Sequence, residues 1–266
     1  MSGNSIVYGL HAVRAVLTRR PDDVIGLTFA RERDDGRQRE LRELASTRGL
    51  PLAVAAAAEL DRLSGGAAHQ GVVAEVRASV ALDENDLLDL LVAAAPPALI
   101  LVLDGVTDPH NLGACLRTAD AAGVLAVVAP RDRAAGLTPA VRKVAAGAAE
   151  TIPFAQVTNL ARTLRDLKSA GLWIVGTAAD AEQELHDADL TGPLAVVMGS
   201  EGQGLRRLTR ESCDFCVRLP MRGTVESLNV AVATGVVLFE ALRQRRRPAA
   251  GLQNPSESGN LRGPHP

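Results

Sequence analysis

The chain has 266 residues, of which 47% are hydrophobic, and its formal net charge is −2. This length suits one large or two ordinary domains with well-formed apolar cores. The charge gives no overall attraction to phosphate, and aromatic residues make up only 2% of the chain. Nucleic acid would therefore have to bind a local basic patch rather than a platform of stacked rings.

The cysteines and histidines predict no metal site. Cys213 and Cys216 have the spacing of half a zinc site, but Cys115 is the only other cysteine and the five histidines are scattered. The odd cysteine number, without a secretory leader, favours a reducing cytoplasm. No apolar run reaches the roughly 18–20 residues that a membrane span needs. We therefore expect a cytoplasmic protein that has neither a membrane-spanning segment nor a metal site.

Residues 1–78 alternate helical and extended patterns, which predicts a small α/β domain of their own. Leu10, Val13, Val16 and Leu17 form one apolar stripe of a helix. The expected elements are a helix over Tyr8–Arg20, a strand over Val24–Phe29, a helix over Arg37–Arg48 and a strand over Gly71–Val76.

Residues 79–97 are expected to be a linker, because an acidic stretch is followed by alanines and by Pro96-Pro97, which cannot continue a helix. The rest of the chain, 98–247, shows continuous apolar runs separated by helical segments, as buried parallel strands do. The expected strands are Leu99–Leu103, Val124–Ala129, Leu172–Gly176 and Leu194–Met198, and the expected helices Leu112–Ala122, Ala140–Ala148, Leu160–Ala170 and Leu228–Arg245. The tail, 248–266, has the composition of a disordered segment.

The first of three polar motifs begins where the run Leu99–Leu103 ends. The turn Asp104-Gly105-Val106-Thr107-Asp108-Pro109-His110-Asn111 leads into a helix that carries Arg117. Asn111 can cap this helix, whereas Arg117 lies nearly two turns further along. A capping asparagine and a solvated arginine would explain the segment equally well without any function.

The second motif is a glycine-rich turn, Gly199-Ser200-Glu201-Gly202-Gln203-Gly204, directly after a buried strand. Its glycines allow positive φ and a close backbone approach to a ligand, and Glu201 is its only carboxylate. The spacing differs from the dinucleotide-binding fingerprint, which would also stand in the first βα turn. Taken alone, an ordinary tight turn explains it as well.

The third motif, Arg218-Leu219-Pro220 through Ser227-Leu228-Asn229, leads into the last helix. Ser227 and Asn229 stand at the mouth of this helix, where free N–H groups and the helix dipole favour electron-rich ligands. Plain capping by Ser227 is the alternative.

In this order the three motifs resemble the signature motifs of the SpoU family of the SPOUT methyltransferase superfamily, over Leu99 to Arg247. Tyr8–Val13 and His69–Val72 resemble that family's ribosomal-protein-like RNA-binding domain. The arrangement is similar to the members that methylate a guanosine of 23S ribosomal RNA. Ser200 and Ala231 depart from the residues usual there, but neither is one of the polar positions.

The resemblance implies an α/β fold with a C-terminal SPOUT domain, a parallel sheet and a deep trefoil knot. It implies a homodimer, S-adenosyl-L-methionine as cofactor, and methyl transfer to a ribose 2′-hydroxyl. Such a transfer needs a hydrogen-bond acceptor and alignment, but neither a metal nor a covalent intermediate. For the dimer contact we expect the last helix to present Val230, Val237, Leu238, Ala241 and Leu242.

The same resemblance assigns roles to matching positions. Arg117 would activate the hydroxyl or, because the pKa of a guanidinium exceeds about 12, orient the hydroxyl and a phosphate. The surrounding polar network would comprise Asn111, Glu201, Ser227 and Asn229. The cofactor would lie on Thr177, Met198, Gly199, Gly202, Leu219 and Leu228, and the RNA on Arg14, His69 and Gln70.

Three alternatives stay open at this point. The same chemistry can act on tRNA or on another ribosomal position, although the small tRNA enzymes of the family lack the N-terminal domain. A non-catalytic RNA-binding protein would not need all five polar residues. A nucleotide-dependent oxidoreductase would need a glycine fingerprint where Asp104–Asp108 stands.

Overall fold

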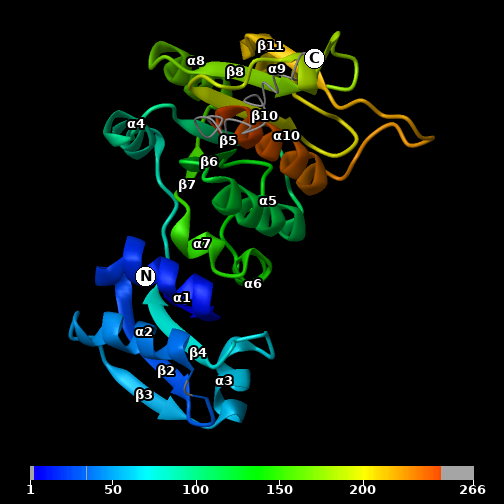
Figure 1. Cartoon of the computed structure of the whole chain (residues 1–266). Coiled ribbons are helices and arrows are strands. Elements are labelled where there is room, and N and C mark those ends of the chain that lie inside the picture. Colours follow the sequence, from blue (N-terminus) through cyan, green and yellow to red (C-terminus); the bar gives the residue numbers. More distant parts are fainter. Residues whose placement is uncertain (1–2, 34, 247–266) are drawn as a thin grey trace, which may run out of the picture.

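The computed structural model describes residues 3–33 and 35–246, and these form two α/β domains joined near residue 80 (Figure 1). The tail 248–266, which we expect to be disordered, lies outside the described residues. Among the residues described, no helix is long and apolar enough to cross a bilayer.

The N-terminal domain is a mixed four-stranded sheet in the order β1-β4-β2-β3. Its strands are β1 (Asn4–Tyr8), β2 (Val24–Ala30), β3 (Leu52–Ala55) and β4 (Val72–Arg77), and its helices α1 (Leu10–Arg19), the 3₁₀ turn η1 (Pro21–Asp23), α2 (Gly36–Ser46) and α3 (Ala57–Ser64). The sequence predicts α1, β2, α2 and β4 but misses β1, β3 and α3. Strand β3 gives no pattern because it is an edge strand whose Leu52 and Val54 are exposed.

The expected linker, 79–97, is only in part a connector. It contains α4 (Glu84–Ala93), which begins with a capping box between Asp83 and Asp86. Leu87 is fully buried in the core of the C-terminal domain, and the Leu82 N–H donates to the Phe154 carbonyl at 2.8 Å. The acidic residues that indicated a linker are the exposed and capping positions of a docked helix.

The C-terminal domain is built on a seven-stranded sheet in the order β7-β6-β5-β10-β8-β11-β9, and every neighbouring pair is parallel. The strands are β5 (Leu99–Asp104), β6 (Ala126–Pro130), β7 (Phe154–Val157), β8 (Trp173–Thr177), β9 (Gln183–Glu184), β10 (Leu194–Gly199) and β11 (Phe215–Arg218). The parallel sheet was predicted; β7, β9 and β11 were missed because each has only two to four residues.

Helices cover both faces of this sheet. They are α5 (Pro109–Ala122), α6 (Pro139–Ala145), α7 (Ala148–Thr151), α8 (Leu160–Ser169), α9 (Arg207–Ser212) and α10 (Val230–Arg245), with a 3₁₀ turn η2 (Leu185–Asp187). The expected single helix Ala140–Ala148 is divided into α6 and α7, because Ala146 and Gly147 both have positive φ.

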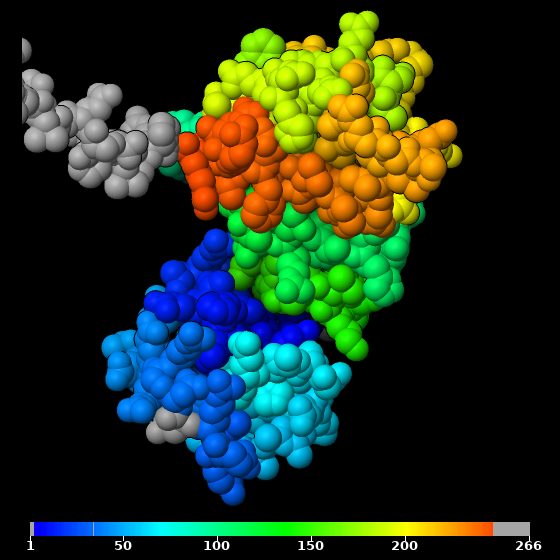
Figure 2. Space-filling model, turned by 45° about the vertical axis from the view of Figure 1, so that its right-hand side comes forward, coloured from blue at the N-terminus to red at the C-terminus, as the bar shows by residue number. Residues whose placement is uncertain are grey.

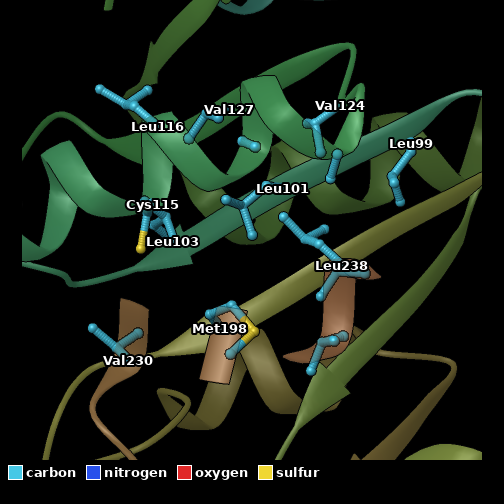
Figure 3. Packing of buried hydrophobic residues seen from close by; sticks show 14 of the residues in the cluster. Leu99, Leu101, Leu103, Cys115, Leu116, Val124, Val127, Met198, Val230 and Leu238 are labelled. Carbon is cyan, nitrogen blue, oxygen red and sulfur yellow. The ribbon is translucent and has the colours of Figure 1, made fainter. Parts of the chain in front are cut away.

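Strand β5 shows how the two faces are filled, since all its residues are buried and its side chains alternate. Leu101 and Leu103 belong to the core that also includes Leu116 of α5 and Leu238 of α10 (Figure 3). Ile100 and Val102 pack on the other face with α4 and α8. Each fully buried leucine or isoleucine contributes about 1.5–3 kcal/mol. This core fixes the edge at which β5, β8, β10 and β11 all end.

Candidate active site

The loops after β8, β10 and β11 enclose a cavity of about 540 Å³ at the carboxyl edge of the sheet. The six residues expected around the cofactor all line it: Thr177, Met198, Gly199, Gly202, Leu219 and Leu228. Three of the expected catalytic residues line it as well, namely Glu201, Ser227 and Asn229. The second and third motifs and the loop after β8, all far apart in sequence, thus meet where parallel strands end.

The glycine-rich turn is a tight hairpin that projects Glu201 toward this cavity. Ser200 and Gly204 exchange backbone hydrogen bonds of 3.1 and 2.9 Å. Gly202 has φ +79°, and a Cβ atom on Gly199 would lie 2.2 Å from the Gly204 carbonyl carbon. Only glycine at 199 permits the hairpin to fold back onto the end of β10.

An ion pair that the sequence did not single out anchors this hairpin. Asp104, at the end of β5, is fully buried. One oxygen of its carboxylate accepts the backbone N–H of Arg206 at 2.9 Å, and the other accepts the Arg206 Nε–H at 2.5 Å. The sequence hinted at this ion pair only through Asp104, a carboxylate that ends an apolar run. Its partner Arg206 could not be recognised, because it lies about a hundred residues further along the chain.

Asn229 is the centre of the polar cluster. Its Nδ2 group donates to Asn111 Oδ1 at 2.9 Å and to Glu201 Oε1 at 2.6 Å. Its Oδ1 accepts the N–H groups of Ala231 and Val232 and so caps α10. The amide therefore uses both hydrogens and its oxygen within the protein.

The capping roles differ from those predicted. Asp108, not Asn111, caps α5, and its carboxylate accepts the His110 N–H at 2.9 Å. Asn229, not Ser227, caps α10. Asn111 is the third residue of α5, buried and hydrogen-bonded to Asn229, because Asp108 already caps the helix.

Two groups of this cluster keep free hydrogen-bonding capacity. Within residues 3–33 and 35–246, Asn111 Nδ2 and the second carboxylate oxygen of Glu201 have no hydrogen-bond partner. Ser227 lines the same cavity and is exposed. A donor and an anionic acceptor thus stand side by side, which suits a bound hydroxyl group.

Arg117 does not join this cluster within one chain. It is exposed on α5 and forms neither a hydrogen bond nor an ion pair with any described residue. The adjacent Thr118 packs on α10, since a Cβ atom on Gly235 would lie 3.8 Å from its Cγ2 atom. Arg117 therefore borders the outer surface where α5 meets α10.

The outer face of α10 differs from the predicted one. Val230, Val237, Leu238 and Ala241 are buried in the chain's own core, and Leu242 is half-buried. The exposed apolar residues are instead Val232, Val236 and Phe239, which recur at helical spacing and are 55, 38 and 49% exposed. Figure 2 shows α10, in orange-red, open on one face of the C-terminal domain beside the green α5–α6 region.

Of the three residues expected to bind RNA, two hold the N-terminal domain together. The Leu10 N–H donates to Gln70 Oε1 at 3.1 Å, at the start of α1. The Gly71 N–H donates to His69 Nδ1 at 3.0 Å, so the ring proton lies on Nε2 and points to Asp61 at 3.2 Å. Arg14 is exposed and pairs with Glu40 at 2.8 Å.

Cys115 and Cys213 are poor nucleophiles at neutral pH. Burial raises the pKa of the Cys115 thiol to about 11 and that of Cys213 to about 12. No group of three or more potential metal-binding side chains occurs in the part of the chain that the structure describes. The arrangement that can do chemistry is the amide–carboxylate cluster beside the cavity.

Comparison with known proteins places these features in a family. The SpoU rRNA Methylase family model matches residues 98–239, and the model for RNA 2′-O ribose methyltransferase substrate binding matches residues 6–80. The chain is 57% identical to the 23S rRNA (guanosine-2′-O-)-methyltransferase RlmB of Pseudomonas putida, covering 92% of this chain and 99% of the relative. It is 53% identical to the enzyme of the same name from Coxiella burnetii, over 94% and 99%.

Solved structures are similar as well. The SpoU methyltransferase AviRb from Streptomyces viridochromogenes, in complex with the cofactor AdoMet, matches with a TM-score of 0.69 at 27% identity, over 91% of each chain. The A. aeolicus TrmH/SpoU tRNA modifying enzyme is 33% identical with a TM-score of 0.53, but it matches only 61% of this chain and 83% of its own.

Proposed function

Because the chain belongs to the SpoU rRNA methylase family, we propose that it transfers a methyl group from S-adenosyl-L-methionine to the ribose 2′-hydroxyl of a guanosine in 23S ribosomal RNA. The observation that carries this proposal is the meeting of Asn111, Glu201 and Asn229 beside the cavity between the motif loops. We propose that the enzyme works in the cytoplasm, on RNA or a ribosomal particle.

The residues of the cavity fit the cofactor. Leu219, Leu228 and Met198 offer apolar walls for an adenine ring, and its volume of about 540 Å³ lies within the usual range for such ligands. Glu201 and Glu226 line it too and would attract a cationic ligand. When bound, the cofactor would supply an activated methyl group on a positively charged sulfur.

The chain's own residues would position the ribose. Glu201 would accept the hydrogen bond of the 2′-hydroxyl with its free oxygen, and Asn111 Nδ2 would donate to a ribose oxygen. Asn229 holds both in place because its amide is fully used within the protein. Alignment of this kind, together with a proton acceptor, makes a hydroxyl reactive without metal.

We further propose that Arg117 reaches the site of a second subunit in a homodimer. It is exposed on α5, whose Thr118 packs on α10, and α10 carries the exposed apolar residues Val232, Val236 and Phe239, a face that proteins seldom leave uncovered. A guanidinium stays charged, so Arg117 would orient the RNA phosphate and hydroxyl rather than remove the proton. The family's trefoil knot is part of the same proposal, with α10 returning to pack between α5 and β10.

The substrate proposal depends on the N-terminal domain. Residues 6–80 match a substrate-binding model, and the tRNA-modifying relative matches only 61% of this chain. We propose that this domain chooses the ribosomal RNA, with exposed Arg14 contacting phosphate; His69 and Gln70 would shape the loop that RNA meets.

The test is a transfer assay with purified protein, labelled S-adenosyl-L-methionine and full-length 23S rRNA. We expect label on one guanosine 2′-oxygen, no label on bulk tRNA, and strongly reduced label when residues 1–80 are deleted. Incorporation into tRNA, or undiminished ribosomal labelling by the truncated protein, would contradict the substrate assignment.

A further inference from the structure

A buried carboxylate joins the N-terminal domain to the C-terminal domain. Glu150 lies in α7 and is only 2% exposed. Its carboxylate accepts a hydrogen bond from Arg20, at the end of α1, at 3.3 Å and from the Ser79 N–H at 2.8 Å, and it pairs with Arg142 of α6. Three separate pieces of chain therefore meet on one side chain.

Arg20 and Arg142 also donate hydrogen bonds to backbone carbonyl groups around this junction. Arg20 Nη1 donates to the Glu150 carbonyl oxygen at 2.9 Å, and Arg20 Nη2 donates to the Arg77 carbonyl at 3.2 Å. Arg142 Nη2 donates to the Ser79 carbonyl at 2.8 Å, and Ser79 Oγ donates to the Ala149 carbonyl at 2.6 Å. A network this well satisfied is costly to break, because it would leave charges buried without partners.

A second contact links the same domain to the helix of Arg117. Arg19 pairs with Asp120 at 2.7 Å, and Asp120 also accepts from the Thr151 hydroxyl at 3.1 Å. Asp120 lies on α5, one turn after Arg117. Helix α1 rests directly on α7, since a Cβ atom on Gly147 would lie 2.6 Å from the Ala12 Cβ atom (Figure 1).

We infer that Arg20 and Glu150 are positioning residues, which hold the substrate-binding domain at a fixed orientation to α5 so that bound RNA presents its ribose to the site. This inference rests on the proposed function. Neither residue lies among the motif residues or lines the cavity of the site. Their effect is on the arrangement that RNA meets, not on the reacting atoms.

The expected change in RNA affinity follows from the fraction of molecules in which the two domains are docked. If loss of Arg20 leaves the docked arrangement populated about a tenth of the time, the apparent affinity for an RNA that contacts both domains falls about tenfold. The rate at saturating RNA should change little, because RNA binding then restores the docked arrangement. Cofactor binding should not change at all.

The experiment compares Arg20→Ala with the wild type in steady-state methylation of 23S rRNA and in small-angle X-ray scattering. The control is Arg162→Ala, which removes an exposed arginine near Asp166 within α8. We expect Arg20→Ala to raise KM for RNA about tenfold with kcat within about twofold, and to enlarge the radius of gyration. Calorimetry should give an unchanged Kd for S-adenosyl-L-methionine, which also reports that the C-terminal domain is folded.

Glu150→Gln and the double variant separate positioning from direct RNA contact. If the two residues act through one junction, Glu150→Gln raises KM as well, and the double variant is no worse than the more affected single one. Additive effects, or a raised KM without any change in scattering, would mean that Arg20 touches RNA itself and would overturn the inference. An unchanged KM in Arg20→Ala would also overturn it, whereas a wild type that does not methylate 23S rRNA would instead refute the proposed function.

Discussion

At the scale of single residues, the site depends on how one amide is used. Asn229 caps α10 with its oxygen and holds Asn111 and Glu201 with its nitrogen, so one side chain joins two motifs to a helix end. Removing it would cost the cap, about 1 kcal/mol, in addition to the alignment of the cluster. Glu201 is the better position for a test, because its substitution leaves the cap intact.

We predict that Glu201→Gln lowers kcat at least about a hundredfold and leaves the melting temperature nearly unchanged. The amide keeps the hydrogen bond to Asn229 but removes the anionic acceptor for the hydroxyl proton, a group worth about 10²–10⁴ in rate. Glu211→Gln, on α9 and paired with Arg207, is the matched control. Near-normal turnover by Glu201→Gln would remove Glu201 from the chemistry.

The residues of the polar cluster could be singled out from the sequence, but their partners could not. The motifs indicated Asn111, Glu201 and Asn229, and all three meet. The pairing Asp104–Arg206 could not be predicted, because it forms between residues that approach only when β5 and β10 lie side by side. For the same reason Asn111 was taken for a helix cap, although Asp108 was available three residues earlier.

At the scale of elements, the ion pair between Asp104 and Arg206 holds the hairpin after β10 in its shape. We predict that Arg206→Ala lowers the free energy of unfolding by about 2 kcal/mol, because it leaves the buried Asp104 carboxylate with a single hydrogen bond. The loss of stability is limited because the Arg206 side chain is itself 45% exposed. Cofactor affinity should fall as well, since the hairpin lines the cavity. Denaturant unfolding and calorimetry measure the two effects, and Arg207→Ala is the neighbouring control. A variant with unchanged stability and affinity would show that the hairpin holds its shape alone.

The outer face of α10 supports a second prediction at this scale. Phe239→Asp should shift the protein from dimer to monomer, because a charge would have to be buried in the apolar contact. Trp173→Asp, which changes an exposed aromatic residue at the start of β8, should leave the dimer unchanged. Light scattering at micromolar concentration measures the state. A Phe239→Asp variant that stays dimeric would place the interface elsewhere.

Helices and strands were predicted where their buried residues follow a regular pattern along the sequence, and were missed where they do not. Strand β5 was predicted because six successive buried residues are unmistakable. Helix α4 was hidden because only Leu87 on it is fully buried, and its charged start resembles a solvated linker. The face of α10 was assigned to the wrong residues, because a helix apolar on several sides does not reveal which side meets its own sheet.

At the scale of the whole molecule, the junction at Glu150 should depend on pH in one direction. Burial raises the pKa of the Glu150 carboxyl, but the Ser79 N–H and Arg142 outweigh it and hold the pKa below its usual value. The stabilisation is therefore complete above the usual carboxyl pKa and is lost as the pH falls through the lowered one. Arg20 and Arg142 are the charged groups that face this carboxylate.

We accordingly predict a constant radius of gyration from about pH 8 to about pH 5 and an expansion only in more acidic solution, below the usual glutamate pKa of about 4.3. Glu150→Gln should lack this transition. Scattering across the pH range measures it. An expansion near neutral pH would mean that another group controls the junction.

A mixing experiment tests whether two subunits complete each site. Arg117→Ala alone should abolish transfer without changing the fold, because the side chain is exposed and unpaired among the described residues. When it is co-refolded in equal amounts with Glu201→Gln, half of the dimers should contain one intact site, which restores about a quarter of the wild-type activity. No recovery in the mixture would place Arg117 and Glu201 in the same subunit's site.

The proposed function is tested most sharply by a map of 2′-O-methylation on 23S rRNA from cells with and without the gene. We predict that one guanosine loses its 2′-O-methyl group when the gene is deleted, and regains it with the wild-type gene but not with Glu201→Gln. A map that does not change on deletion would contradict it.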